Sequence, residues 1–417
     1  MTHDMGRAGQ AGPPMPQIRR DPDYDVIVVG GRVAGAATAM LLARSGHRVL
    51  VLERSPMPSD TVSTHAILRS GVLQLRRWGL LDSIITAGTP PIAQITLGFG
   101  DERIEFDVRD EYGVDTLYAP RRHLLDDIIL RAAVDAGAEV RDRTTVGGLA
   151  LDRDGRVVGV RVRQAGEAPA ITARHVIGAD GHRSRVAEWA GALTKKSHEP
   201  TNAVHYAYFE GIDRAGFWFQ FSRGVNVGLV PTNGDQCLVF AGRPAALRRR
   251  FTADPDAEFN RLLRQGGADL AELVAAGTRV SGFRGTTGLA GHLRQAWGPG
   301  WSLVGDAGYT KDPISAHGIS DALRDAELCA RAVDRALTDP SNTHAALDWY
   351  ETTRDHLSSR VFAESEALAR FEWAADEASR RMRVVSEEVR AECELIQSLP
   401  SWPAVTGLAR SIGAGQL

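Results

Sequence analysis

Lysine, cysteine and long apolar runs are all scarce in this chain of 417 residues. Its three cysteines, Cys237, Cys329 and Cys393, lie far apart and form no Cys-x-x-Cys pair, which argues against a disulfide framework and a structural zinc site. Free thiols are typical of a reducing compartment, so the sequence predicts a cytoplasmic protein without a bound metal. No apolar run approaches the roughly 20 residues that a membrane span needs.

A strong charge of one sign is also absent. The formal net charge is −3, from 49 basic and 52 acidic residues, so nothing indicates a nucleic acid or an anionic membrane as a partner. The lysines of the chain are Lys195, Lys196 and Lys311, and arginine supplies the other basic residues. Residues 1–22 lack an apolar core segment and are expected to form a flexible tail rather than a signal peptide.

What the chain does contain is a β-α-β unit close to its beginning. Residues 24–29 are a short, mostly β-branched run, which is typical of a strand buried on both faces of a parallel sheet. An Ala- and Leu-rich helix is expected over residues 34–45, and a second buried strand over residues 48–53. Together these segments predict a Rossmann-type sheet.

The turn between this strand and helix has the spacing of a dinucleotide-binding fingerprint. A tight turn there exposes a helix N-terminus, whose N–H groups and dipole can hold a pyrophosphate. Glu53 follows Gly35 by 18 residues and ends the second strand, where its carboxylate can accept hydrogen bonds from ribose hydroxyls. The residues assigned to this end of the site are Gly30, Gly31, Arg32, Val33, Ala34, Gly35, Glu53 and Arg54.

Arg32 stands where the fingerprint has its middle glycine. A side chain at that position limits how closely the backbone can approach a phosphate. We therefore expect the guanidinium group to compensate by reaching the phosphate itself. A β-α-β turn that binds no nucleotide is the alternative interpretation of this motif.

Two further strand ends carry an aspartate beside a glycine. Asp180-Gly181 precedes a helix that begins with basic residues and a serine. Gly305-Asp306 ends another buried strand, where the aspartate can accept a hydrogen bond from a ribityl hydroxyl. The next helix begins at Gly318, Ile319 and Ser320, and its N–H groups and positive dipole suit the anionic edge of a reduced flavin.

The pattern changes between residues 202 and 284, where aromatic residues occur on short alternating segments. This alternation predicts an antiparallel sheet with one solvated face, with helical residues 256–276 inside it. A helix is also expected over residues 319–336, and the chain from residue 343 onward is expected to be mainly helical.

The order of the three motifs, with the β-rich segment between the second and the third, resembles the class A flavin monooxygenases of para-hydroxybenzoate hydroxylase type. The resemblance covers roughly residues 25–336 and implies an α/β fold, in which a Rossmann-type FAD-binding domain is interrupted by a β-rich substrate domain and followed by C-terminal helices. The implied limits are residues 23–91, 117–190 and 284–337 for the FAD-binding domain, 92–116 and 191–283 for the substrate domain, and 338–417 for the helices.

The resemblance also implies a reaction. An enzyme of this type binds FAD, is reduced by NADH or NADPH that docks without a Rossmann domain of its own, and uses O₂ to hydroxylate its substrate through a flavin C4a-hydroperoxide. The expected substrate is an aromatic or polyketide-like small molecule of secondary metabolism. Arg69 matches a basic position near the cofactor pyrophosphate, and Arg122 matches a flavin-contacting position. A solvated surface arginine is the alternative for each.

The loop over residues 309–318 is expected to face the isoalloxazine ring and the substrate, with Lys311, Pro313 and His317 as catalytic candidates. Our hypothesis is that Lys311 or His317 supports proton transfer or stabilises charge beside the flavin. The alternatives are a surface ion pair between Lys311 and Asp312, and a histidine that only caps the next helix.

Two segments outside the motifs are weaker candidates for the same cavity. His65 lies on the segment that leads to Arg69, and residues 217–221 form an aromatic cluster that could line an apolar substrate pocket. The simpler interpretation is a structural histidine and ordinary core packing.

Three other functions fit parts of the pattern. A flavin halogenase shares the first lobe, but that family carries an active-site lysine upstream, whereas this chain has no lysine before Lys195. A reductase of the geranylgeranyl-reductase type would keep the motifs and transfer hydride to a carbon–carbon double bond. A flavin-binding sensor would hold FAD without oxidising NAD(P)H.

Overall fold

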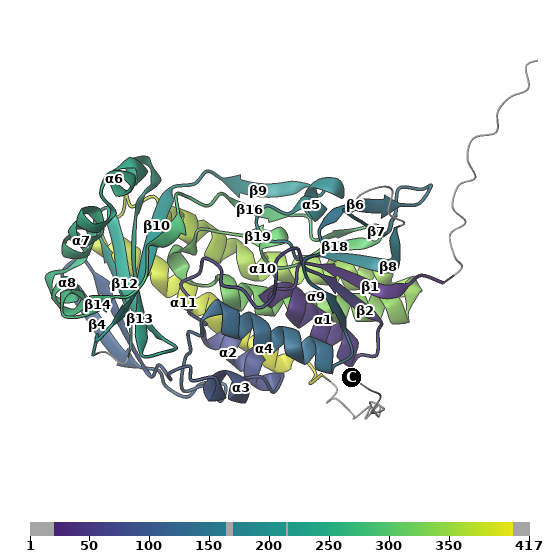
Figure 1. Cartoon of the computed structure of the whole chain (residues 1–417), viewed down its shortest axis with the longest axis horizontal. Coiled ribbons are helices and arrows are strands. Elements are labelled where there is room, and N and C mark those ends of the chain that lie inside the picture. Colours follow the sequence, from purple (N-terminus) through teal and green to yellow (C-terminus); the bar gives the residue numbers. More distant parts are fainter. Residues whose placement is uncertain (1–20, 164–169, 214–215, 403–417) are drawn as a thin grey trace, which may run out of the picture.

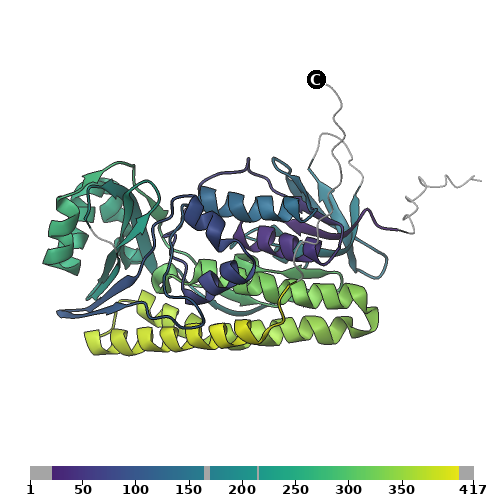
Figure 2. The same cartoon turned by 90° about the horizontal axis from the view of Figure 1, so that it is seen from below.

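The computed structural model describes residues 21–163, 170–213 and 216–402. The molecule is elongated, with a β-rich half at one end and a mostly parallel sheet at the other (Figure 1). Two long C-terminal helices run along one side of the molecule (Figure 2). The tail expected at residues 1–22 lies almost entirely outside the described residues.

The mostly parallel sheet is built from the apolar runs that the sequence predicts. Val26 to Val29 pair in register with Val49 to Leu52, and all eight of these residues are buried. A strand with both faces covered needs apolar side chains on both faces, which explains the continuous runs. In spatial order, the strands are β17 (Trp297–Gly298), β18 (Trp301–Leu303), β8 (Ile171–Gly178), β1 (Tyr24–Val29), β2 (Val49–Leu52) and β5 (Glu139–Arg141).

The two faces of this sheet pack against different elements. Val26 and Val28 share one apolar core with three helices, whereas Ile27 and Leu50 belong to another core, formed with a hairpin and a short helix. The hairpin turns at Asp154 and Gly155. The covering elements are α1 (Val33–Arg44), α4 (Arg122–Asp135) and α9 (Gly318–Thr338) on the first face, and β6 (Val146–Leu151), β7 (Val157–Val162) and α5 (Arg185–Trp189) on the second.

The β-rich sheet differs from the prediction because neither face of its central strands is solvated. Every residue of its central strand, Val225–Thr232, is buried. One face packs on helices, and the opposite face, with Tyr206 and Phe219, joins the core of the FAD-binding half. The strands in order are β14 (Thr278–Arg279), β10 (Asn202–Glu210), β13 (Gln236–Pro244), β12 (Val225–Thr232), β11 (Phe217–Ser222), β3 (Gln94–Phe99) and β4 (Glu102–Asp107), with β15 (Arg284–Thr286) also pairing with β10.

The helix predicted over residues 256–276 is two helices, because Gly267 interrupts it. They are α7 (Pro255–Gly266) and α8 (Ala268–Ala275), and they follow α6 (Arg248–Ala253) and η1 (Ala245–Leu247). Asp254 caps α7 by accepting a hydrogen bond from the Ala257 backbone N–H.

A small third sheet joins the two halves of the molecule. It contains β9 (Thr194–His198), β16 (Gly291–Arg294) and β19 (Tyr309–Thr310). β9 falls in the expected substrate segment but pairs with β16 of the expected FAD-binding segment, and β15 falls in the FAD-binding segment but pairs with β10. The limits expected at residues 191 and 284 therefore differ from the strand pairing.

The last helix of the described chain packs against both halves of the molecule. The helix α11 (Ala375–Ser398) contacts α2 (Arg69–Arg77), β3 and β11, so the end of the chain packs against early segments from both halves. None of the described helices is long and apolar enough to cross a membrane. The other elements are α3 (Leu81–Thr86), α10 (Thr343–Ala369), η2 (Gly305–Ala307), η3 (Pro313–Ser315) and η4 (Pro340–Asn342).

Candidate functional site

The glycine turn after β1 leaves no space for side chains. Gly30 has a φ of +108°, and a Cβ atom there would lie 2.3 Å from the carbonyl oxygen of Ala179. A Cβ atom on Gly35 would lie 1.9 Å from the carbonyl oxygen of Gly30. The backbone of β1, the start of α1 and the end of β8 are thus in direct contact, and the predicted tight turn is present.

Glu53 fixes this turn from the end of β2. Its carboxylate accepts a hydrogen bond from the Gly31 N–H at 2.9 Å and another from the Ser55 N–H at 2.8 Å. A carboxylate has further lone pairs beyond these two bonds, so the group can still accept hydrogen bonds from a ribose. Gly31 lies directly over this side chain, because a Cβ atom there would be 3.2 Å from Glu53 Cβ.

Arg32 does not extend freely toward the space in front of the turn, in contrast to our expectation. Its guanidinium donates to Asp126 of α4 at 3.1 Å and to Ser59 Oγ at 3.0 Å. Arg122 holds the same carboxylate through two bonds, of 3.0 and 3.1 Å. The fully buried Asp126 therefore joins the two predicted arginines. The i,i+4 spacing of Arg122 and Asp126 was the signal that could have revealed this residue.

The Asp180-Gly181 motif ends β8 beside the glycine turn. Asp180 accepts hydrogen bonds from the Arg185 N–H at 2.7 Å and the Val186 N–H at 3.1 Å, so it closes the start of α5. Gly181 has a φ of +82°, which allows the chain to reverse there. The aspartate thus shapes the loop next to the nucleotide turn.

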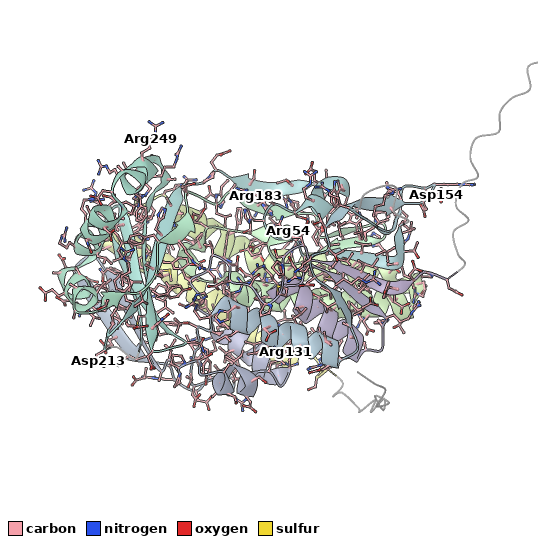
Figure 3. The ribbon with its side chains drawn as sticks, in the orientation of Figure 1. Arg54, Arg131, Asp154, Arg183, Asp213 and Arg249 are labelled. Carbon is pink, nitrogen blue, oxygen red and sulfur yellow. The ribbon has the colours of Figure 1, made fainter. Side chains whose placement is uncertain are left out.

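Positive charge gathers around this loop. The pKa of His182 is lowered by partial burial and by the charges of Arg183, Arg294 and Arg54, so these four side chains lie near one another. Arg54 and Arg183 are exposed and lie in the middle of the molecule (Figure 3). The predicted Arg54 therefore belongs to a cationic surface.

The third motif brings the two ends of the site together. A Cβ atom on Gly305 would lie 2.8 Å from Ala34 Cβ, so η2 touches the start of α1. Asp306 is exposed, although the residues on both sides of it are buried. Asp306 therefore lies on the short helix that touches the start of α1, close to the glycine turn.

The N-terminus of α9 is open. Gly318 is exposed, and a Cβ atom there would meet no other atom within 4 Å. Ile319 and Ser320 are buried, and Ser320 Oγ accepts a hydrogen bond from the Leu68 N–H at 3.0 Å. The first N–H groups of this 21-residue helix face a space that an anion can enter.

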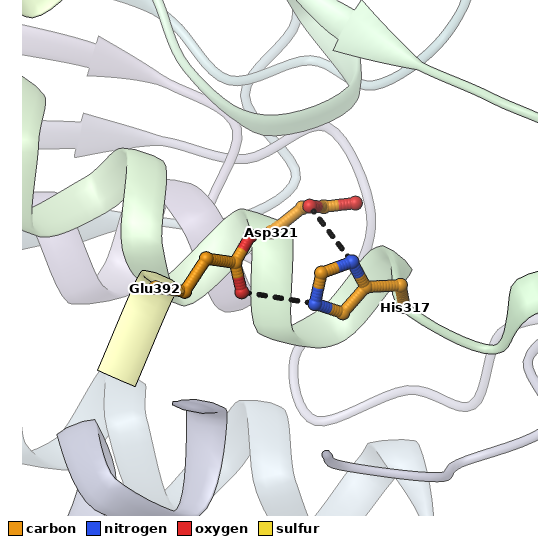
Figure 4. A group of neighbouring side chains, drawn as sticks. All are labelled: His317, Asp321 and Glu392. Carbon is orange, nitrogen blue, oxygen red and sulfur yellow. Dashed lines mark hydrogen bonds and ion pairs between the residues drawn. The ribbon is translucent and has the colours of Figure 1, made fainter. Parts of the chain in front are cut away.

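Behind this helix start lies a buried network of charges. Lys311 is 6% exposed and bonds to Asp321 on the first turns of α9, not to Asp312 at the surface as in one of our two expectations. His317 is fully buried, and its Nε2 lies 2.9 Å from Glu392 of α11. Its Nδ1 lies 3.4 Å from Asp321 (Figure 4).

Glu392 was not foreseen, because it lies 75 residues from its partner and no local pattern marks it. Burial alone would raise the pKa of Glu392, but the charges of His317 and Arg324 lower it to about 2. Arg324 bonds to Glu392, lies 3.1 Å from Asp321 and lies 2.7 Å from Asp325. Three elements of the chain therefore meet in one ionic cluster.

The same cluster contains residue types that bind metal ions, but its carboxylates are already neutralised by cationic side chains. His317, Asp321 and Glu392 offer ligand atoms within 4.8 Å of one another. Lys311 and Arg324 already bind these carboxylates, so a cation would have to displace two others. The arrangement fits a network of ion pairs that holds the helix start in place.

His65 is a structural partner of the β-rich half. It is fully buried, has a left-handed φ of +66°, and its Nε2 lies 2.6 Å from the hydroxyl of Tyr208. Burial lowers its pKa to about 3, so the imidazole is neutral. This placement agrees with the simpler of our two interpretations.

Arg69 lies beside a cavity and does not contact the glycine turn. Its guanidinium donates to the carbonyl oxygens of Arg109 at 2.7 Å and Val114 at 2.5 Å, which fixes the loop between them. The cavity measures about 400 Å³, which is within the usual range for a small-molecule site. Its walls include Leu68, Ile95, Leu97, Leu117, Phe217, Phe219, Ile314, Ser315, Ala316, Met382, Val385, Ser386, Val389 and Arg390.

The loop over residues 309–318 and the aromatic segment thus line one space. Ile314, Ser315 and Ala316 come from the loop that contains Pro313, and Phe217 and Phe219 come from β11. The prediction that the aromatic cluster lines a pocket agrees with this placement for the two phenylalanines. Our sequence analysis missed α11 as a wall of the cavity.

Comparison with known proteins gives the same picture. A family model described as "FAD binding domain" matches residues 23–365. The chain is 26% identical to 6-methylpretetramide 4-monooxygenase of Streptomyces rimosus, covering 94% of this chain and 92% of that protein. It is 25% identical to digeranylgeranylglycerophospholipid reductase of Methanosarcina acetivorans, covering 90% and 92%.

Solved structures share the fold. PqsL of Pseudomonas aeruginosa, described as a probable FAD-dependent monooxygenase, superposes with a TM-score of 0.74 at 22% identity, over 87% of this chain and 99% of that one. The flavin-dependent brominase Bmp2 superposes with a TM-score of 0.75 at 19% identity, over 89% and 93%. The α/β fold with a β-rich insertion and C-terminal helices is therefore confirmed, as is the resemblance to class A flavin monooxygenases.

Proposed function

The chain belongs to the FAD-binding domain family and is an FAD-dependent oxidoreductase, and from this premise we propose that it is a monooxygenase that hydroxylates an aromatic or polycyclic small molecule. The observation that carries the proposal is the position of the cavity. Its wall includes residues 314–316, which lead directly into the open N-terminus of α9. A substrate in this cavity lies next to the place where the dipole of α9 favours the anionic edge of a reduced flavin.

The residues present fit FAD along the whole site. The turn from Gly30 to Gly35 would hold the pyrophosphate, Glu53 the ribose, and Asp306 the ribityl chain, because Glu53 contacts Gly31 and Gly305 lies against Ala34 at the start of α1. Gly318 to Ser320 would hold the flavin pyrimidine ring. When bound and reduced, FAD would activate O₂, so that one oxygen atom of O₂ enters the substrate and the other leaves as water.

We assign positioning roles to the three catalytic candidates. Lys311 and His317 are buried and bonded to carboxylates, so they act by fixing the charge and the position of the helix start. Pro313 fixes the loop conformation, because its ring sets φ at the first position of η3. The apolar walls of the cavity would keep water away from the reacting atoms.

The cationic surface around Arg54, His182, Arg183 and Arg294 suits the phosphates of NADH or NADPH, which we propose as the transient reductant. It lies beside the Asp180 loop, so a nicotinamide nucleotide bound there needs no second fingerprint. The three cysteines are buried free thiols, which is consistent with work in the cytoplasm.

A reductase that saturates a carbon–carbon double bond is the second candidate. Several relatives are named digeranylgeranylglycerophospholipid reductase, and the same FAD site would serve both reactions. The monooxygenase is favoured because the PqsL structure contains 2-aminobenzoylacetate, a small aromatic ligand, and a cavity of about 400 Å³ suits a ligand of that kind. The halogenase neighbours share the fold, but no lysine precedes Lys195 in this chain.

The deciding experiment is to reduce the FAD-loaded protein with NADH or NADPH without oxygen, and then add O₂ with a panel of phenolic and polyketide compounds. The proposal predicts that O₂ uptake matches NAD(P)H oxidation. The product should be heavier than its substrate by about 16 mass units, the mass of one oxygen atom. NAD(P)H oxidation without O₂ uptake, with a double bond reduced in the product, would identify the reductase instead.

The role of His317 has a separate test. Replacing Glu392 by Gln removes the negative charge that holds His317, and His317→Gln removes the imidazole itself. Both variants should change the reduction potential of bound FAD and slow its stopped-flow reoxidation. An unchanged potential and unchanged reoxidation in both variants would contradict the role.

A further inference from the structure

Two arginines converge on one carboxylate at the edge of the cavity. Arg69 Nε lies 3.9 Å from one oxygen of Glu111, and a guanidinium nitrogen of Arg390 lies 3.9 Å from the other. All three residues line the cavity, together with Arg109 and Asp107. They come from α2, the loop after β4, and α11, so three separate segments bring these charges together.

The bonds between these groups are loose. A separation of 3.9 Å is longer than a hydrogen bond, and exposed ion pairs of this kind are weak. The side chains of Arg390 and Glu111 are 59% and 43% exposed, so both can move. Arg69, in contrast, is 17% exposed and is fixed by backbone carbonyl groups. One guanidinium is therefore preorganised, and the other is mobile.

Beyond this polar edge, the cavity is apolar. Ile95, Leu97, Phe217 and Phe219 form one wall, and the side chains of α11 form another. A ligand that fills the space therefore needs an apolar body, and any charged group on it must lie at the edge where the arginines meet.

We propose that the substrate carries one anionic group, such as a carboxylate, phenolate or phosphate, which binds between Arg69 and Arg390 in competition with Glu111. This assignment rests on the proposed function, and it names the class of substrate as an apolar molecule with a single anionic end. Arginine suits this task because its planar fork pairs with an oxyanion through two hydrogen bonds. Glu111 lowers the affinity for the anion, because its carboxylate competes for the same two guanidinium groups.

The test compares two dyes that share one aromatic skeleton. Fluorescence titration of the FAD-loaded protein with 8-anilino-1-naphthalenesulfonate measures an aryl anion, and N-phenyl-1-naphthylamine is the matched neutral probe. Arg390→Gln should weaken binding of the anionic dye about fivefold to tenfold and leave the neutral dye unchanged. Glu111→Gln should tighten binding of the anionic dye severalfold, because the competing carboxylate is gone.

Matched controls are available on the same elements. Arg383 is exposed on α11 and Asp110 is exposed beside Glu111, and neither belongs to the cavity wall, so Arg383→Gln and Asp110→Asn should leave both dyes unchanged. Ser386→Trp adds bulk to the cavity at an exposed position and should weaken both dyes.

Equal binding of the two dyes, with neither charge variant affecting the anionic one, would overturn the proposal. Anionic-dye binding that changes in none of the five variants, Ser386→Trp included, would overturn it as well. Displacement by anthracene-2-carboxylate or by farnesyl phosphate tells a ring-bearing anion from a chain-bearing one. A protein that shows this charge selectivity but never consumes O₂ would refute the monooxygenase alone, whereas coupled O₂ uptake without charge selectivity would refute this inference alone.

Discussion

The two ends of the proposed FAD site are built in opposite ways. At the nucleotide end, the chain packs so closely that two positions have room only for glycine. Gly30 lies against the backbone of Ala179, and Gly35 lies against the backbone of Gly30. At the flavin end, the start of α9 is supported by buried charges, including Arg324 and Glu392. The first end depends on close backbone contacts at a few glycines, and the second depends on charges that residues 311–325 and the distant Glu392 of α11 contribute. We therefore expect substitutions at the nucleotide end to destabilise the protein through steric clash. Substitutions at the flavin end should destabilise it by leaving buried charges without a partner.

The largest expected effect is at the flavin end. Arg324 is 1% exposed and is surrounded by Asp321, Asp325 and Glu392, so Arg324→Met removes the cation that these three buried carboxylates share. Lys311 still binds Asp321 and His317 still binds Glu392, but Asp325 loses its ion pair. The free energy of unfolding should fall by about 3–5 kcal/mol, as measured by urea denaturation.

The matched control is an exposed ion pair. Arg380 and Asp376 of α11 are 69% and 77% exposed, and Arg380→Met should cost less than about 1 kcal/mol. Similar losses of unfolding free energy in the two variants would mean that burying the ion pairs adds nothing to their contribution to stability.

At the nucleotide end, Gly35→Ala should cost about 3 kcal/mol of unfolding free energy, because the new Cβ would overlap the Gly30 carbonyl oxygen and force the turn apart. The protein should also lose FAD, which the absorbance ratio at the flavin and protein bands reports. Gly148→Ala is the control, since a Cβ there would meet no atom within 4 Å. Full FAD content in Gly35→Ala would show that the close contact is dispensable.

A pH effect of intermediate size is expected from the loop between the two ends. Asp312 is fully buried, and one of its oxygens accepts hydrogen bonds from Asn202 at 2.9 Å and from the Ile314 N–H at 3.0 Å. The other oxygen lacks a hydrogen-bond partner among the described residues. Burial raises the pKa of Asp312 to about 7 from its ordinary value of 3.8.

Because the folded protein holds this proton more tightly than the unfolded chain does, the stability it contributes is complete below pH 3.8 and is lost as the pH rises toward 7. Asp312→Asn keeps the accepting oxygen and removes the titration. It should have little effect at pH 4 and stabilise the protein by up to about 4 kcal/mol at pH 8, measured as thermal unfolding at both values. The same change in stability at both pH values would contradict this account.

The smallest effect separates cofactor binding from folding. Gly318→Ala has room within the protein, so the thermal stability of the FAD-free protein should not change. The added methyl group faces the space proposed for the flavin, and FAD affinity should fall about tenfold, measured by fluorescence titration. Unchanged affinity would move the flavin away from the start of α9.

The sequence reveals those parts that depend on neighbours along the chain. The buried strands and the glycine turn follow from apolar runs and from residues 30–35, and the structure contains them where they were predicted. The bond between His317 and Glu392 could not be predicted, because it depends on how α11 returns to α9. The expected solvated face of the antiparallel sheet was wrong for a similar reason, since α7 and α8 cover it. The assignments of individual residues to FAD stay predictions.

The helix α11 contributes a short stretch of residues to the wall of the cavity. Met382, Val385, Ser386, Val389 and Arg390 follow the three- and four-residue spacing of a single helical face, and all five line the cavity. A handful of substitutions on this face could redirect the enzyme to new molecules while the flavin machinery stays intact. For enzyme engineering, these five positions are a small set of sites to randomise together.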